Sequence, residues 1–83
     1  MQTRERTSDE LAALVTAELR KHPGFDSFGS VRVYGHPEKL VPDGINWSIA
    51  GFNKGACEIG PDEIKSALAR IRARLGRHYR AAH

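Results

Sequence analysis

Two stretches near the middle of the chain alternate apolar and polar residues: Val31-Arg32-Val33-Tyr34 and Gly44-Ile45-Asn46-Trp47-Ser48-Ile49. Alternation with a period of two is typical of half-buried strands. The connection between them is rich in proline and glycine and ends in the turn signal Pro42-Asp43-Gly44. The pattern therefore predicts two paired strands, over residues 30–36 and 45–52.

A helical pattern lies on each side of these strands. Thr7-Ser8-Asp9-Glu10 has the form of a capping box, and apolar residues at helical spacing follow it until His22-Pro23-Gly24 ends the helix. The second helix begins at Pro61, and its apolar stripe comprises Ile64, Leu68, Ile71, Leu75 and Tyr79. This order predicts an α+β fold of the αββα type, with two layers: both helices pack on one face of a small antiparallel sheet. A short third strand at 56–59 is left open.

The strand alternation also assigns side chains to faces. Ile45, Trp47 and Ile49 share one face. Because the apolar stripe of the second helix needs an apolar surface opposite, we expect Trp47 to pack under that helix as part of the core. The other sheet face is expected to carry Arg32, Tyr34, Asn46, Ser48 and Phe52.

The chain of 83 residues is long enough for one domain, which we place at 7–80, between a flexible N-terminus (1–6) and a C-terminal tail (81–83). A domain of this size buries a small fraction of its surface. A two-stranded sheet is marginal in water, and its edges are open to pairing. These features favour a homodimer.

The composition indicates a compartment. The single cysteine, Cys57, cannot form an internal disulfide, whereas small secreted domains usually carry several. No apolar run is long enough for a signal peptide or a membrane span. We therefore expect a cytoplasmic protein without membrane contact.

The net charge of +3 is concentrated in the last segment, where residues 61–83 hold six basic and two acidic side chains. Such an excess is a candidate contact for nucleic acid or an acidic protein. The alternative is a solvated helix face whose arginines offset the helix dipole. The candidate contact residues are Lys65, Arg70, Arg74, Arg77 and Arg80.

The sequence offers little for catalysis or cofactor binding. Cys57 and His36 are a thiol and an imidazole, but a hairpin would place them at opposite ends, so we interpret Cys57 as a buried, inert residue. The four histidines lack metal-ligand spacing, and the glycines at 51, 55 and 60 fit no phosphate-binding pattern. No catalytic residue, metal or cofactor is predicted, and small-molecule or thiol chemistry around Cys57 ranks last among the hypotheses.

The segment Gly44-Ile45-Asn46-Trp47-Ser48-Ile49, with the long helix after it, resembles a group of small uncharacterised bacterial proteins that carry a Gly-x-Asn-Trp strand between two helices. The resemblance covers residues 8–80 and implies the same element order, but no activity. The order is also similar to that of double-stranded-RNA-binding domains. Those domains begin their final helix with lysines, where this chain has Pro61-Asp62-Glu63. The leading hypothesis is a non-catalytic interaction domain that works as a homodimer, and nucleic-acid binding is the alternative.

Overall fold

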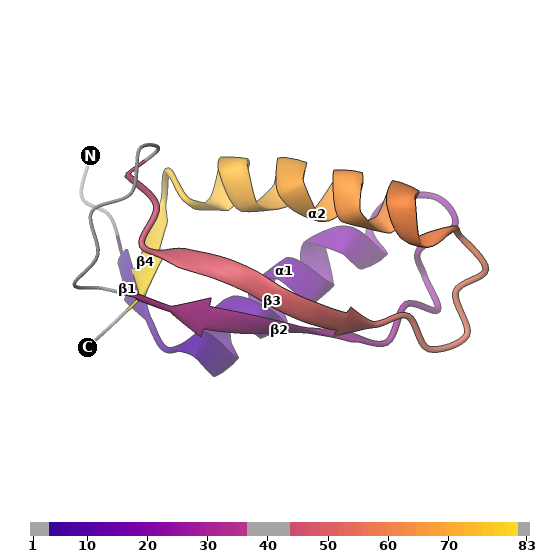
Figure 1. The fold of residues 1–83 in the computed structure, drawn as a ribbon, viewed down its shortest axis with the longest axis horizontal. Coiled ribbons are helices and arrows are strands. Elements are labelled where there is room, and N and C mark those ends of the chain that lie inside the picture. Colours follow the sequence, from indigo (N-terminus) through magenta and orange to yellow (C-terminus); the bar gives the residue numbers. More distant parts are fainter. Residues whose placement is uncertain (1–3, 37–43, 82–83) are drawn as a thin grey trace.

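The computed structural model describes residues 4–36 and 44–81. It has an α+β fold with two helices and short strands (Figure 1). The elements follow in the order β1 (Arg4–Arg6), α1 (Ser8–Arg20), β2 (Ser30–Gly35), β3 (Trp47–Asn53), α2 (Pro61–Leu75) and β4 (Tyr79–Ala81). The predicted helices and the predicted central strands are therefore present.

Helix α1 begins at the predicted capping box. The hydroxyl of Thr7 accepts from the backbone N–H of Glu10, and the Glu10 carboxylate accepts from the backbone N–H of Thr7, each at 3.1 Å. Two of the amides that a helix N-terminus leaves unbonded are thereby satisfied. The core face of the helix carries Leu11, Val15 and Leu19, all fully buried.

Strands β2 and β3 form an antiparallel hairpin, whose register pairs Gly35 with Trp47 and Val33 with Ile49. The register shifts beyond that point, so that Arg32 pairs with Gly51 and Val31 with Phe52. One extra residue, Ala50, therefore bulges from β3 and reverses the alternation of the residues after it.

The bulge corrects one predicted face. Phe52 was expected beside Tyr34 on the open side, but it lies opposite the buried Val31 and packs against the core, with its ring centroid 6.1 Å from that of Phe28. Asn46, also expected on the open side, is 6% exposed.

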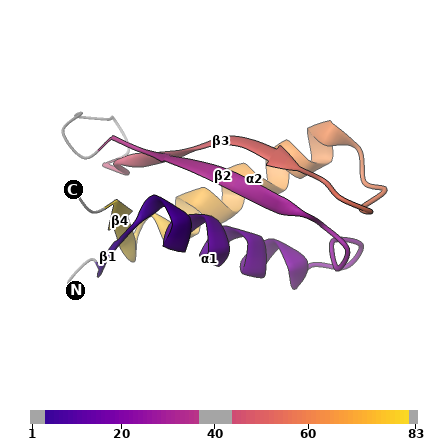
Figure 2. The same cartoon turned by 90° about the horizontal axis from the view of Figure 1, so that it is seen from below.

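Helix α2 starts with Pro61 after the extended Gly60 and buries Ile64, Leu68, Ile71 and Leu75. We expected α2 to pack on the face of the sheet, but it does not lie directly beneath the two strands. In Figure 1, α2 runs along the side of β3 that faces away from β2, while α1 crosses behind the hairpin. The view in Figure 2 agrees, with α1 nearest β2 and α2 beyond both strands. Helix α2 therefore covers the β3 side of the hairpin.

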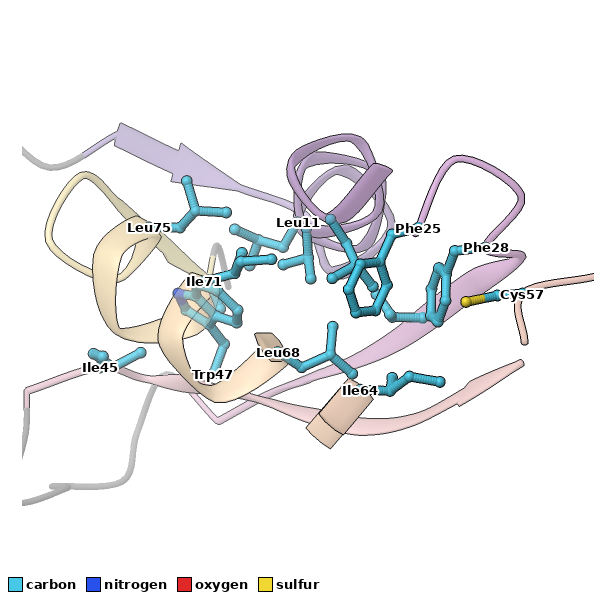
Figure 3. Close-up of a cluster of buried hydrophobic side chains, with 14 residues drawn as sticks. Leu11, Phe25, Phe28, Ile45, Trp47, Cys57, Ile64, Leu68, Ile71 and Leu75 are labelled. Atoms are coloured by element: carbon cyan, nitrogen blue, oxygen red, sulfur yellow. The ribbon is translucent and has the colours of Figure 1, made fainter. Parts of the chain in front are cut away.

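The core lies between the two helices and the hairpin (Figure 3). Trp47 is completely buried and lies beside Ile71 and Leu68 of α2, which confirms its predicted place. The Trp47 carbonyl accepts from the Arg72 side-chain Nε at 2.9 Å, which ties α2 to the outer edge of β3.

A second, parallel pair of strands joins the two end segments of the described chain. Strand β1, within the segment predicted as a flexible N-terminus, pairs with β4, so that Arg4 lies opposite Tyr79 and Arg6 opposite Ala81. The guanidinium of Arg6 lies over the Tyr79 ring, 5.6 Å from its centroid. Extra strand pairing thus comes from the ends of the chain.

A third strand at 56–59, which the sequence left open, does not form, and the chain makes a turn there instead. The backbone N–H of Cys57 donates to the Lys54 carbonyl at 3.1 Å, and no strand is assigned at 56–59 among the described residues. The chain bends there toward α2, so this segment cannot extend along β3.

Candidate interaction surfaces

The five predicted basic residues do not form one surface. Lys65 and Arg70 are five positions apart on α2, so they point about 140° apart around the helix axis. Arg77 lies in the turn after α2, and Arg80 lies on β4. All five side chains are exposed.

Arg70 and Arg74 do share the flank of α2 that faces α1. They line a groove of about 750 Å³ between α2 and the segment that follows α1, with Phe25, Ala67 and Ile71 as its apolar part. Arg74 is engaged there, because its Nη2 lies 2.6 Å from Oε2 of Glu18 on α1. The rim also carries Asp62 and Glu63, so the groove has no uniform positive charge.

Glu18 connects the two helices at this groove. Lys21 donates to its other oxygen at 3.1 Å and is the main cause that lowers the pKa of the Glu18 carboxyl. The charges of Arg74 and His22 lower this pKa further. The Arg74–Glu18 ion pair therefore joins α2 to α1, and nucleic-acid binding by the basic set stays a prediction.

Cys57 is buried, as predicted, and its thiol lies 3.5 Å from the Gly24 carbonyl oxygen. His36 belongs to the other end of the hairpin, since its backbone N–H donates to the Asn46 carbonyl at 2.8 Å, whereas Cys57 follows the strand end that pairs with Ser30. The structure does not bring the thiol and the imidazole together.

The hairpin instead brings His36 to Ser48, with 3.1 Å between Nε2 and Oγ. Sequence reasoning missed this pair, although the paired register of two adjacent strands was the signal that could have found it. A serine–histidine pair needs a group that orients the imidazole. Among residues 4–36 and 44–81, the buried Nδ1 of His36 has no hydrogen-bond partner that could orient the ring in this way.

The outer face of the hairpin carries Arg32 and Tyr34. Tyr34 is 58% exposed and is the large apolar side chain most open to solvent in the described part of the chain. Its ring centroid is 6.0 Å from that of His36. The end of the Arg32 side chain lies over Gly51 of β3, about 3.3 Å from where a Cβ would stand.

The two outer edges of the hairpin differ. The β3 edge is bonded at Trp47 by Arg72 of α2. The β2–β3 sheet has two strands, and within residues 4–36 and 44–81 no segment pairs with the outer edge of β2. In the view of Figure 2, β2 is the strand nearest the viewer and no described element crosses in front of it.

The side chains of the described residues form no cluster suited to a metal ion. The described residues contain no group of three or more histidine, cysteine, aspartate or glutamate side chains able to hold a metal ion. Within the same residues, no helix has the length and apolar character needed to cross a membrane.

Comparison with known proteins adds no relative. No protein-family model, no curated protein and no solved structure matches the chain. The likeness of the Gly-x-Asn-Trp segment to small bacterial proteins is therefore carried by its sequence pattern alone.

Proposed function

We propose that this chain is a small, intracellular, non-catalytic interaction domain that works as a homodimer. The observation that carries the proposal is the outer edge of β2, whose backbone N–H and C=O groups have no paired strand among the described residues. Such an edge is a template for another strand. Adding one extends a two-stranded sheet, which is marginal alone, into a larger one.

The side chains of β2 support this use of the edge. Its sequence, Ser-Val-Arg-Val-Tyr-Gly, combines β-branched and aromatic residues and contains no proline. Natural edge strands are often protected by lysine, proline or a bulge. The bulge of this hairpin lies on β3, and the exposed Tyr34 lies on the open strand. Tyrosine is enriched in protein interfaces.

A copy of the same chain is the partner we favour because a pairing between two identical edges closes on itself. A two-fold dimer buries the same patch on both subunits. The sheet edge is then used up in both copies, so the association stops at two.

Size-exclusion chromatography with light scattering, at micromolar concentrations, tests the proposal. We expect the mass of a dimer for the wild-type protein and of a monomer for Tyr34→Lys, because a lysine at this place adds charge and removes the aromatic ring. Ala73→Lys adds the same charge on the exposed side of α2 and should stay dimeric. A monomeric wild-type protein would overturn the homodimer, and a dimeric Tyr34→Lys protein would remove β2 from its interface.

A further inference from the structure

We infer that the two copies join β2 to β2 in an antiparallel register centred on Val33, which places Arg32 of each copy opposite Tyr34 of the partner subunit. This inference rests on the proposed homodimer and specifies its interface. It follows from which backbone groups of β2 point outward, from the symmetry of the pairing and from the side chains that each register would bring together.

The inward and outward backbone groups follow from one hydrogen bond. The N–H of His36 donates to the carbonyl of Asn46 on the neighbouring chain segment, so His36 directs its backbone groups toward β3. In an antiparallel ladder, alternate residues direct their groups to the two sides. The backbone groups of Tyr34 and Arg32 therefore point toward β3, like those of His36. The backbone groups of Val31, Val33 and Gly35 point away from β3.

An independent contact supports this assignment. Trp47 pairs with Gly35, and its carbonyl accepts from Arg72 on the far side of β3. The Gly35–Trp47 pair thus directs its backbone groups away from the hairpin on both strands. The extra residue of the bulge lies in β3, so the alternation of β2 itself is uninterrupted.

Two-fold symmetry limits the registers that can form. The two β2 strands must be antiparallel, and one residue must lie on the axis opposite itself. Centring on Val33 pairs Val31 with Gly35 of the partner subunit and uses every outward-pointing residue of the strand. Centring on Arg32 or Tyr34 leaves one outward-pointing residue of β2, Gly35 or Val31, without a strand residue opposite.

The side chains disfavour the register centred on Arg32 and favour the register centred on Val33. A register centred on Arg32 sets two guanidinium groups against each other, and like charges directly opposite are destabilising. A register centred on Val33 instead sets Arg32 opposite the exposed ring of Tyr34 in the partner subunit. A guanidinium over an aromatic face is attractive. The chain already contains such a contact, between Arg6 and Tyr79.

The helix beside this edge is also suited to a close neighbour. Between Glu10 and Glu18, helix α1 carries no charged side chain. A hollow of about 340 Å³ lies between α1 and the start of β2, and its helical wall is formed by the small side chains of Ala12, Ala13, Thr16 and Ala17 together with Arg20 at the end of α1. Small side chains let a second subunit approach a helix closely. This flank of α1, with Arg20 at its end, and the open strand edge thus form one continuous surface.

Disulfide trapping tests the register. Arg32→Cys and Tyr34→Cys are made separately in a Cys57→Ala background, mixed under reducing conditions to exchange subunits, and then mildly oxidised. Directly opposed Cβ atoms lie about 4.5–5.5 Å apart, near the span of a disulfide, whereas diagonal neighbours lie about 7–8 Å apart. We expect the mixed disulfide in several-fold excess over both symmetric ones by intact-mass spectrometry, and little cross-linking when either variant is oxidised alone.

The outcomes separate this inference from the proposed function. A predominant Arg32→Cys or Tyr34→Cys symmetric disulfide would overturn the Val33-centred register while leaving the dimer intact. A protein that is dimeric by light scattering yet forms none of these disulfides would overturn every β2 pairing centred on Arg32, Val33 or Tyr34. A monomer by light scattering, in the Cys57→Ala parent and in the wild type, would overturn the homodimer itself.

Discussion

At the scale of single residues, Asn46 and Trp47 connect the hairpin to β4. The Asn46 side chain accepts from the Ala81 N–H at 2.8 Å and donates to the Ala81 carbonyl at 3.2 Å, as a backbone peptide would. The Trp47 indole N–H donates to the Tyr79 carbonyl at 3.2 Å. The Gly-x-Asn-Trp segment therefore has a structural role. The side chains of Asn46 and Trp47 make hydrogen bonds to the backbone of β4 that a further strand would otherwise make.

Replacing Trp47 with alanine should remove most of the stability of the protein. The side chain is fully buried between α2 and the hairpin, and such truncations cost about 3–5 kcal/mol. Small domains have little more than this in total. Urea unfolding followed by far-UV circular dichroism measures the loss. Trp47→Phe, which keeps an apolar ring but loses the indole donor, should cost less.

The emission of the only tryptophan provides a control in the wild-type protein. It should be blue-shifted in the native state and move to longer wavelength on unfolding. Native emission at the solvent-exposed wavelength, together with a wild-type urea midpoint for Trp47→Ala, would contradict the burial.

Gly76 illustrates a glycine that packing requires. It follows α2 with helical backbone angles, where alanine has the better helix propensity. A Cβ at this place would stand about 2.5 Å from Cγ1 of the buried Ile45. We expect Gly76→Ala to destabilise the protein, because relieving the overlap requires the core to shift, and overpacking typically costs about 1–3 kcal/mol.

A double-mutant cycle with Ile45→Ala tests the cause. Removing the Ile45 side chain makes room for the new methyl group, so the double variant should lose less stability than the two single variants together. Additive losses, or a stabilised Gly76→Ala protein, would show that the overlap with Ile45 is not the reason that position 76 requires glycine.

At the scale of elements, the capping box of α1 makes the stability of the folded protein depend on pH. Hydrogen bonds from the backbone and side chain of Thr7 lower the pKa of Glu10 from its ordinary 4.5, and Arg6 lowers it further. A group whose pKa is lower in the folded state stabilises the fold above its unfolded pKa and loses this effect as pH falls through the folded value. Stability should therefore decline below about pH 4.5.

Glu10→Gln isolates this contribution, since an amide oxygen can still accept the Thr7 N–H but does not titrate. The urea midpoint of the wild-type protein should fall more steeply between pH 6 and pH 3 than that of Glu10→Gln. The remaining slope of the variant includes Glu18, whose pKa is also lowered. Parallel pH profiles for the two proteins would contradict the role of the Glu10 carboxylate.

Local patterns predicted α1, α2, β2 and β3, because caps, apolar spacing and alternation depend on residues close together in the chain. Strands β1 and β4 have three residues each and no periodicity, and their pairing joins opposite ends of the described chain, so no local pattern indicates them. The face of Phe52 was predicted wrongly because the bulge at Ala50 is set by strand register. Gly51 beside it was the one sequence hint of an irregular strand.

The candidate surfaces likewise include features that the local sequence predicted and contacts that it did not predict. The exposure of Tyr34 followed from alternation, and the burial of Cys57 followed from its residue type. The contact of Arg74 with Glu18 depends on how α1 and α2 pack, and the Ser48–His36 contact depends on strand register. Side-chain pairs that cross between elements therefore required the structure.

At the scale of the whole molecule, β4 completes the fold, since it contacts both β1 and the Asn46–Trp47 segment. A chain that ends after His78 would lose all three residues of β4. The buried Asn46 amide and the Trp47 indole N–H would lose their partners, and an unsatisfied buried polar group costs about 1–3 kcal/mol. We expect this chain to be unfolded or to melt far below the wild-type protein, whereas a chain that ends after Ala81 should melt like it.

Because the shorter chain can fail to fold for other reasons, Asn46→Asp in the full chain tests the same contacts. Its carboxylate can still accept from the Ala81 N–H but cannot donate to the Ala81 carbonyl. We therefore expect Asn46→Asp to lose a large part of the stability that the chain ending after His78 loses. Thermal unfolding of the four proteins, followed by circular dichroism, measures the effect. If the chain that ends at His78 and the Asn46→Asp protein both melt at the wild-type temperature, β4 is dispensable, and the core formed by α1, α2 and the hairpin is sufficient for the fold.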